Sequence, residues 1–253
     1  MTNDPRTRDD LLEAMGKRAC PLCVLVERIE RKAVDLFLYD QVNDISRRDA
    51  LRASRGLCIY HTAMLAEGRS ALGVAIVSRD VLRAMTAELE NHHGARGERR
   101  EERDNSSPKL QPSVPSATAA VKTFLSSALG KGSAQLAARI GPQAGCPMCA
   151  ERPRVEAPLI GGLLRNFGDA AFVAAFEACG GLCRVHLVNT LRAADVATGR
   201  ALAARQAAAW RRLEAELDEF IRKHDYRFQG EVLDAERDVW RRALRLTSGW
   251  YEE

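Results

Sequence analysis

The sequence lacks the features that mark a membrane protein or a secreted one. It contains no run of about 18 apolar residues, which is the length that a membrane-spanning helix requires. Residues 1–6 are polar, and no apolar core of a signal peptide follows them. We therefore expect a protein without a membrane segment that works in the cytoplasm.

The motifs of several enzyme classes are also missing. There is no His-Glu-x-x-His, no Gly-x-Ser-x-Gly, and no His followed two residues later by Glu, as zinc deaminases require. Residues 130–133 are not a phosphate-binding loop, because Leu125 stands where the first glycine is needed. These absences favour a protein without catalysis of its own. An enzyme with a pocket between the two halves of the chain is an alternative.

The chain has little excess of either charge. Its 253 residues include 38 Lys and Arg against 34 Asp and Glu, which leaves a net charge of +4. Nucleic-acid-binding domains usually carry a strong basic patch. The sequence has no strong nucleic-acid signal, and we expect a protein partner instead. No oligomeric state follows from these features.

What the sequence does contain is a pair of cysteine motifs that occurs twice. Cys-Pro-x-Cys begins at Cys20 and again at Cys146, which is 126 residues later (146 − 20). Gly-Leu-Cys-x-x-His begins at Gly56 and again at Gly181, which is 125 residues later (181 − 56). A register kept to within one residue indicates a duplicated unit whose copies share these residues.

Three thiolates and one imidazole are the ligands of a structural zinc site, because they fill a tetrahedral shell and leave no position for water or substrate. The long spacer within each copy is typical of a helical hairpin whose ends return to one point. We therefore predict one zinc site in each half, and two Zn²⁺ per chain. The ligands of the first site are Cys20, Cys23, Cys58 and His61, and those of the second are Cys146, Cys149, Cys183 and His186.

Other interpretations of the cysteines remain open. An iron–sulfur cluster held by three Cys and one His would fit the same ligands, and the protein would then be an electron carrier or a metal or redox sensor. Thiol–disulfide exchange by Cys-Pro-x-Cys is disfavoured, because that motif normally follows a strand and here helical segments precede it. Cys179 has no counterpart in the first copy, where Ser54 stands. It is interpreted as a small apolar filler, with a reactive thiol as the alternative.

The apolar residues recur at helical spacing throughout, which predicts an all-α fold of two similar halves related by a pseudo-two-fold axis. The first half is residues 1–94 and the second is residues 119–253, which includes a C-terminal helix. The charged and Pro- and Ser-rich residues 95–118 are interpreted as a flexible linker. Each Cys-x-x-His motif is expected to open one long helix, the second of which would reach Lys223.

The order of the motifs resembles an uncharacterised family of bacterial proteins, a domain of unknown function. In that family the Cys-Pro-x-Cys and Gly-Leu-Cys-x-x-His unit is often doubled, and the chain ends in a helix with a Trp-x-Arg-Ala-like motif. Here that ending is Trp240-Arg241-Arg242-Ala243. The resemblance implies paired metal sites and no particular substrate. We expect a zinc-stabilised helical protein that serves interaction or regulation.

Overall fold

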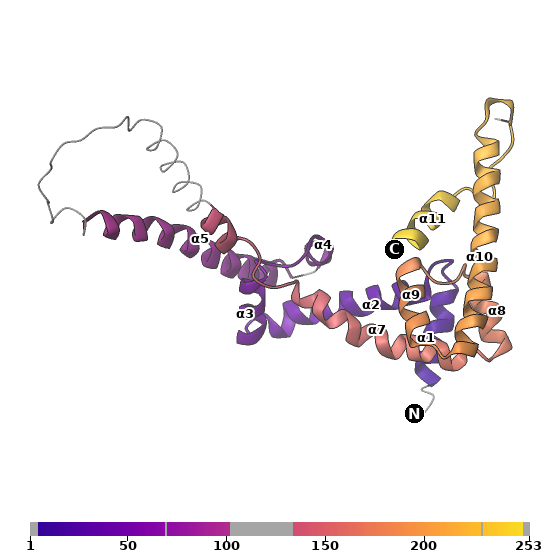
Figure 1. Ribbon diagram of the computed structural model, residues 1–253, viewed down its shortest axis with the longest axis horizontal. Helices are drawn as coiled ribbons and strands as arrows, with labels where there is room; N and C mark the ends of the chain where they lie inside the picture. Colours follow the sequence, from indigo (N-terminus) through magenta and orange to yellow (C-terminus); the bar gives the residue numbers. More distant parts are fainter. Residues whose placement is uncertain (1–4, 69, 102–133, 229, 250–253) are drawn as a thin grey trace, which may run out of the picture. The chain divides into compact units, whose positions relative to one another are not determined.

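The computed structural model describes residues 5–68, 70–101, 134–228 and 230–249. Helices dominate these residues, and no strand occurs among them, which confirms the all-α prediction (Figure 1). In chain order they are α1 (Pro5–Met15), α2 (Pro21–Leu36), the π-helical turn η1 (Phe37–Gln41), α3 (Ile45–Ala53), α4 (Ile59–Glu67), α5 (Ala71–Glu101), α7 (Pro147–Asn166), α8 (Ala170–Ala178), α9 (Arg184–Ala193), α10 (Val196–Lys223), the 3₁₀ turn η2 (Tyr226–Phe228) and α11 (Val239–Ser248). Residues 134–140 are also helical.

The two copies of the repeat build the same series of local structures. Helices α2, α3, α4 and α5 of the first copy correspond to α7, α8, α9 and α10 of the second. Asp44 accepts a hydrogen bond at the start of α3, and Asp169 does the same at the start of α8, where each satisfies an amide that has no partner within its helix. The duplication seen in the motifs therefore extends to the capping residues between them.

The helix that follows each Cys-x-x-His motif is short, which corrects the prediction of one long helix. The backbone leaves the helical conformation at Gly68, where ψ is 152°, and at Ala194, where ψ is 147°. Asp195 then accepts hydrogen bonds from the amides of Ala197 and Thr198 and starts α10. The short polar residue after the break acts as a new helix start, so each histidine lies on a short helix of its own.

The chain forms two compact units whose composition does not follow the halves predicted from the sequence. Unit 1 consists of Met1–Lys32 and Glu151–Glu253, and unit 2 consists of Ala33–Ala150. Each border lies inside a helix, α2 in one case and α7 in the other. Each unit therefore combines segments from both copies of the repeat. The pseudo-two-fold relation stays a prediction.

Unit 1 has the larger core. In it α1 packs against α8, and α10 packs against α8 and α11. Its most deeply buried side chains include Leu11, Leu163, Phe172, Phe176 and Leu202, each 0% exposed. The core of unit 2 lies around η1, α3, α4 and α5 and includes Val34, Phe37, Leu51, Met64 and Val77. Cys20, Cys23 and Cys183 belong to the core of unit 1.

The segment predicted as a linker is helical at its start. Residues 95–101 continue α5, and residues 102–118 lie outside the described residues. None of the described helices combines the length and the apolar composition that crossing a bilayer requires.

Alanine substitutions at two glycines of unit 1 test how closely α1 packs on α7. A Cβ on Gly162 would lie 2.5 Å from Cγ2 of Thr7, whereas a Cβ on Gly199 would lie 3.6 Å from that of Ala194. We expect Gly162→Ala to lower the free energy of unfolding by about 1–3 kcal/mol, because α1 must move away. Gly199→Ala should raise it by about 0.5–1 kcal/mol through helix propensity. Thermal unfolding of both variants measures this, and a stabilised Gly162→Ala protein would contradict the packing.

Candidate metal centres

The eight residues predicted as metal ligands lie in two groups of four, but the groups are not the predicted ones. Each group takes the Cys-x-x-Cys pair of one repeat and the Cys-x-x-His pair of the other. The first, here called the buried cluster, consists of Cys20, Cys23, Cys183 and His186; the second, the exposed cluster, consists of Cys58, His61, Cys146 and Cys149. The predicted pairing within each half is therefore corrected. Either cluster could hold a metal ion.

The helix that follows the first Cys-x-x-Cys pair carries the chain away from Cys20. From Pro21 on, α2 continues unbroken for 16 residues, about 24 Å of helix. It begins in unit 1 and ends in unit 2. The Cys-x-x-His pair of the same repeat follows in unit 2, where the Cys-x-x-Cys pair of the second repeat is found.

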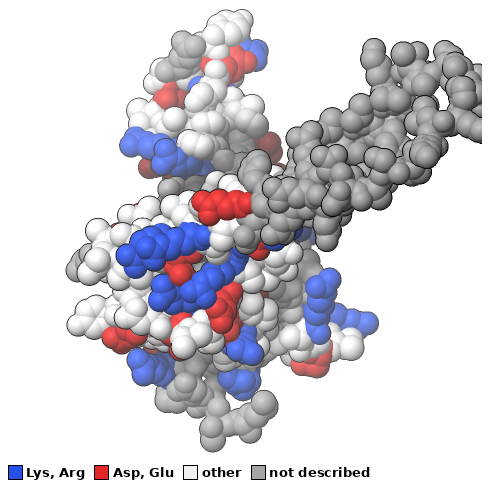
Figure 2. All heavy atoms as spheres, turned by 90° about the vertical axis from the view of Figure 1, so that its left-hand side faces the viewer, with Lys and Arg blue, Asp and Glu red and all other residues white. Residues whose placement is uncertain are grey.

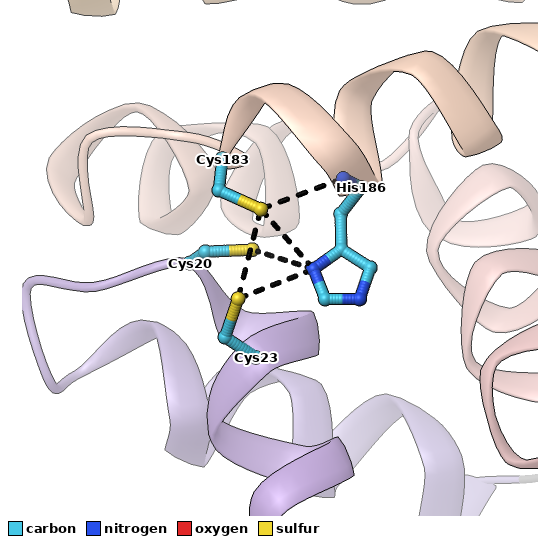
Figure 3. A group of neighbouring side chains, drawn as sticks. All are labelled: Cys20, Cys23, Cys183 and His186. Carbon is cyan, nitrogen blue, oxygen red and sulfur yellow. Dashed lines mark hydrogen bonds between the residues drawn. The ribbon is translucent and has the colours of Figure 1, made fainter. Parts of the chain in front are cut away.

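In the buried cluster, four side chains from two helix starts converge on one point (Figure 3). Cys20 immediately precedes α2 and Cys23 lies in its first turn, while Cys183 immediately precedes α9 and His186 lies in its first turn. Nδ1 of His186 is 3.5 Å from Sγ of Cys20, 3.2 Å from Sγ of Cys23 and 3.3 Å from Sγ of Cys183. Sγ of Cys23 and Sγ of Cys183 are 3.6 Å apart.

These separations are those of a metal shell. Zinc–sulfur bonds of about 2.3 Å and zinc–nitrogen bonds of about 2.0 Å at tetrahedral angles put the sulfurs about 3.8 Å apart and each sulfur about 3.5 Å from the nitrogen. The measured distances lie close to these edges and are far longer than the S–S bond of a disulfide. All four ligand atoms lie within 4.8 Å of one another in each cluster. The donor set and its spacing therefore fit a four-coordinate ion.

The loop before α9 is shaped to present Cys183. Gly181 has φ +80°, a conformation that favours glycine, and a Cβ there would lie 2.5 Å from Oε1 of Gln206. The fully buried Gln206 of α10 accepts a hydrogen bond of 2.7 Å from the amide of Leu182. Cys183 then accepts from the amide of His186 and forms the N-cap of α9. This chain of contacts ties the ligand to the core.

The end of α11 lies against the buried cluster. Gly249 ends that helix with φ +78°, and its carbonyl oxygen is 3.7 Å from Sγ of Cys23. A Cβ on Gly249 would lie 3.0 Å from Val185 and 3.5 Å from Sγ of Cys183. A glycine at this position lets the backbone approach the sulfurs closely, so the C-terminal helix helps to exclude water from them.

Glu156 of α7 orients His186 from the side opposite the sulfurs. Its Oε1 lies 3.4 Å from Nε2 of His186, the distance of an ion pair, and its Oε2 accepts from Asn189. A carboxylate on the far nitrogen of a ligating histidine fixes the ring and makes the other nitrogen a better donor. Glu156 is thus a positioning residue for the buried cluster.

The exposed cluster repeats the donor set in unit 2. Nδ1 of His61 is 3.3 Å from Sγ of Cys58, 3.7 Å from Sγ of Cys146 and 3.5 Å from Sγ of Cys149. Sγ of Cys58 and Sγ of Cys149 are 3.6 Å apart. His61 is fully buried, but Cys58 and Cys146 are partly accessible and Cys149 is exposed. The two clusters have the same chemistry and different access to solvent.

In the metal-free clusters, burial and hydrogen bonds between neighbouring ligand side chains shift the pKa values of those side chains. Burial opposes ionisation of Cys58, but hydrogen bonds from the backbone and side chain of His61 and from Cys149 outweigh it and lower the pKa of Cys58 to about 7. Burial also disfavours the imidazolium of His186, yet hydrogen bonds with Cys183, Cys20 and Glu156 raise the pKa of that ring to about 12. A cation that binds here displaces these protons, so its affinity falls as the pH is lowered.

Cys179 is not part of either cluster. It is 4% exposed, lies in the core of unit 1 and donates a hydrogen bond of 3.1 Å to the carbonyl oxygen of Phe176. Burial raises the pKa of its thiol to about 12, which keeps it protonated. Both features agree with the interpretation of Cys179 as an apolar filler.

Sequence reasoning missed two residues that support the buried cluster. Glu156 follows Cys146 at the same interval at which Glu30 follows Cys20, so an acidic residue shared by the repeats was a signal that could have found it. Glu30 itself is buried and pairs with Arg152 at 2.9 Å. Gln206 left no such signal, because it is a single polar residue in an Ala-rich helix.

The exchange of partners predicts which double variants lose zinc. Cys23→Ser/Cys183→Ser removes two ligands of one cluster, so the variant should retain one zinc per chain. Cys23→Ser/Cys58→Ser removes one ligand from each cluster and should lose both ions, although both residues belong to the first repeat. Elemental analysis of the purified variants measures this. The reverse result would restore the pairing within each half.

The carboxylate of Glu156 should matter for metal affinity. We expect Glu156→Gln to weaken zinc binding at the buried cluster by about 10- to 100-fold, because the imidazole loses its anionic partner. Competition with a chelator of known affinity measures the change. Glu151→Gln is the matched control on the same helix, since Glu151 pairs with the exposed Arg154. Equal affinities of the Glu156→Gln and Glu151→Gln proteins would refute the positioning role.

Comparison with known proteins places the chain in a family. A segment of 83 residues, 33% of the chain, is 36% identical to an uncharacterised 23.9 kDa protein in the xynA 3′ region of Caldicellulosiruptor sp. (strain Rt8B.4). The match spans 39% of that relative's length. No solved structure matches the chain. Residues 10–253 match a family of unknown function, DUF6062, and the chain belongs to that family.

Proposed function

We propose that this protein binds two zinc ions and uses them to hold helical surfaces in place for interaction or regulation, without catalysis of its own. The observation that carries the proposal is the closure of both clusters. Each offers three sulfurs and one imidazole nitrogen for the four corners of a tetrahedron, so no position is left for a substrate. Chemistry at such an ion is confined to its own ligands.

The donor set favours zinc over its rivals. Cys₃His is a common shell of structural Zn²⁺. An iron–sulfur cluster can be held by the same residues, but its ligands bind different iron atoms and therefore lie farther apart than the ligands of a single ion. The distances of 3.2–3.7 Å between ligand atoms fit a single ion better. Metal binding at such sites contributes folding free energy of about 10–16 kcal/mol, which unit 2 with its smaller core would need most.

The surface supports a protein partner rather than a nucleic acid. On the face drawn in Figure 2, Lys and Arg side chains lie beside Asp and Glu side chains instead of forming one basic field. Ion pairs such as that between Arg52 and Asp80, at 2.9 Å, mix the charges in the same way. The thiolates require reducing conditions, which agrees with a location in the cytoplasm.

Metal analysis of the full chain, purified without oxygen, tests this function. We expect about two zinc ions per chain and no absorption in the visible region, and we expect a chelator to lower the midpoint of thermal unfolding. Iron and sulfide with a brown colour would replace the proposal by an electron carrier or redox sensor.

Chemical crosslinking in cells tests the partner. The wild-type chain should capture a protein that the zinc-free Cys23→Ser/Cys58→Ser variant does not, and Cys179→Ser should behave as the wild type. Equal capture by the wild type and the zinc-free variant would show that the zinc-held surfaces are not the ones that bind.

A further inference from the structure

The two Cys-Pro-x-Cys motifs have the same two cysteines at the same spacing, but one motif is buried and the other is accessible to solvent. All residues from Ala19 to Val26 are buried, and Cys20 and Cys23 are 4% and 6% exposed. In the second motif no residue is buried, and Cys149 is exposed. One cysteine cluster of the chain is therefore accessible to solvent, and the other is buried.

The segments around the exposed cluster are open as well. Residues 142–145, which lead into Cys146, are all exposed, and a Cβ on Gly145 would contact nothing within 4 Å. Ile59, which follows Cys58 directly, is 91% exposed. In the buried cluster the corresponding Cys183 is 0% exposed and Gly249 lies against its sulfur. Reagents in solution can reach one set of sulfurs without unfolding the chain.

We propose that Cys149 is a modification site, a solvent-facing zinc thiolate that hydroperoxides oxidise, and that its oxidation releases the zinc ion of the exposed cluster while the buried cluster keeps its own. This inference rests on the proposed binding of zinc. It adds a regulated state, in which the chain holds one ion instead of two, to the proposed function.

The chemistry uses atoms that the site already brings together. The thiolate of Cys149 attacks one peroxide oxygen, the O–O bond breaks, and the departing oxygen takes a proton and leaves as water or an alcohol. The sulfenic acid formed on Cys149 is then attacked by the thiolate of Cys58, whose Sγ is 3.6 Å away. The S–S bond forms, the S–O bond breaks, and hydroxide leaves and is protonated to water. Two electrons pass from the two thiolates to the peroxide.

Loss of these two ligands ends metal binding at that site. Cys146 and His61 remain, and two donors do not make the four-coordinate shell that zinc requires. The buried cluster resists the same sequence, because access as well as thiolate character determines whether a cysteine is oxidised.

The test begins with the zinc content of the full-length protein. A chain that lacks two zinc ions before any oxidant is added overturns both the proposed function and this inference. With two ions present, hydrogen peroxide is added and released zinc is followed with 4-(2-pyridylazo)resorcinol. We expect one ion to appear at least about ten times faster than the other, and peptide mapping to find a Cys58–Cys149 disulfide. Release of both ions at one rate overturns this inference and leaves the proposed function standing.

Two variants and a second reagent sharpen the result. Cys149→His keeps four donors while it removes the exposed thiolate, so the fast release should vanish, whereas Cys179→Ser should release zinc as the wild type does. N-ethylmaleimide labelling of the wild-type protein decides the matter if Cys149→His does not retain its ion. Cys149 should label first and Cys20, Cys23 and Cys183 last; earlier labelling of the buried cluster overturns the proposal.

Discussion

The convergence of three sulfurs and one nitrogen on a point is the constraint on which the surrounding structure depends. A hydrophobic core tolerates many combinations of side chains, but the edges of a coordination tetrahedron are fixed to within tenths of an ångström. The support of the buried cluster shows how that precision is reached. Gly181 turns the chain, Gln206 holds the following amide, and Glu156 fixes the ring of His186. Each contact links a ligand to an element of the core, so the metal centre and the fold cannot be separated.

The sequence predicted the parts of this structure that depend on local patterns. The all-helical fold, the glycine before each ligand pair and the eight clustered residues were all readable from spacing and type. The pairing of Cys20 with His186 was not, because Cys-x-x-Cys motifs in duplicated units are chemically identical and no local rule says which copy meets which. That choice depends on where the chain runs after α2, which is decided by tertiary packing. The break at Ala194 was likewise missed, although Asp195 directly after it is a residue type that favours the start of a new helix.

The difference between the two clusters shows how context divides the roles of identical donors. The thiols of Cys23 and Cys149 occupy the same position in their motifs, yet one is surrounded by a core of Leu and Phe and the other faces water. Buried apolar surroundings hinder ligand exchange and keep reagents away from the sulfurs. A site that is open to solvent permits ligand exchange and lets reagents in. A duplicated gene can in this way keep one copy of a site for stability and leave the other accessible, with no change in the ligand residues.

The exchange of partners also determines when the protein can finish folding during synthesis. A nascent chain that ends near residue 94 carries one Cys-x-x-Cys pair and one Cys-x-x-His pair that belong to different sites, so it holds two half-shells and no complete one. Neither set of four ligands is complete until residues from the segment 146–186 have emerged from the ribosome. A single repeat released at that stage lacks the residues that would complete either shell.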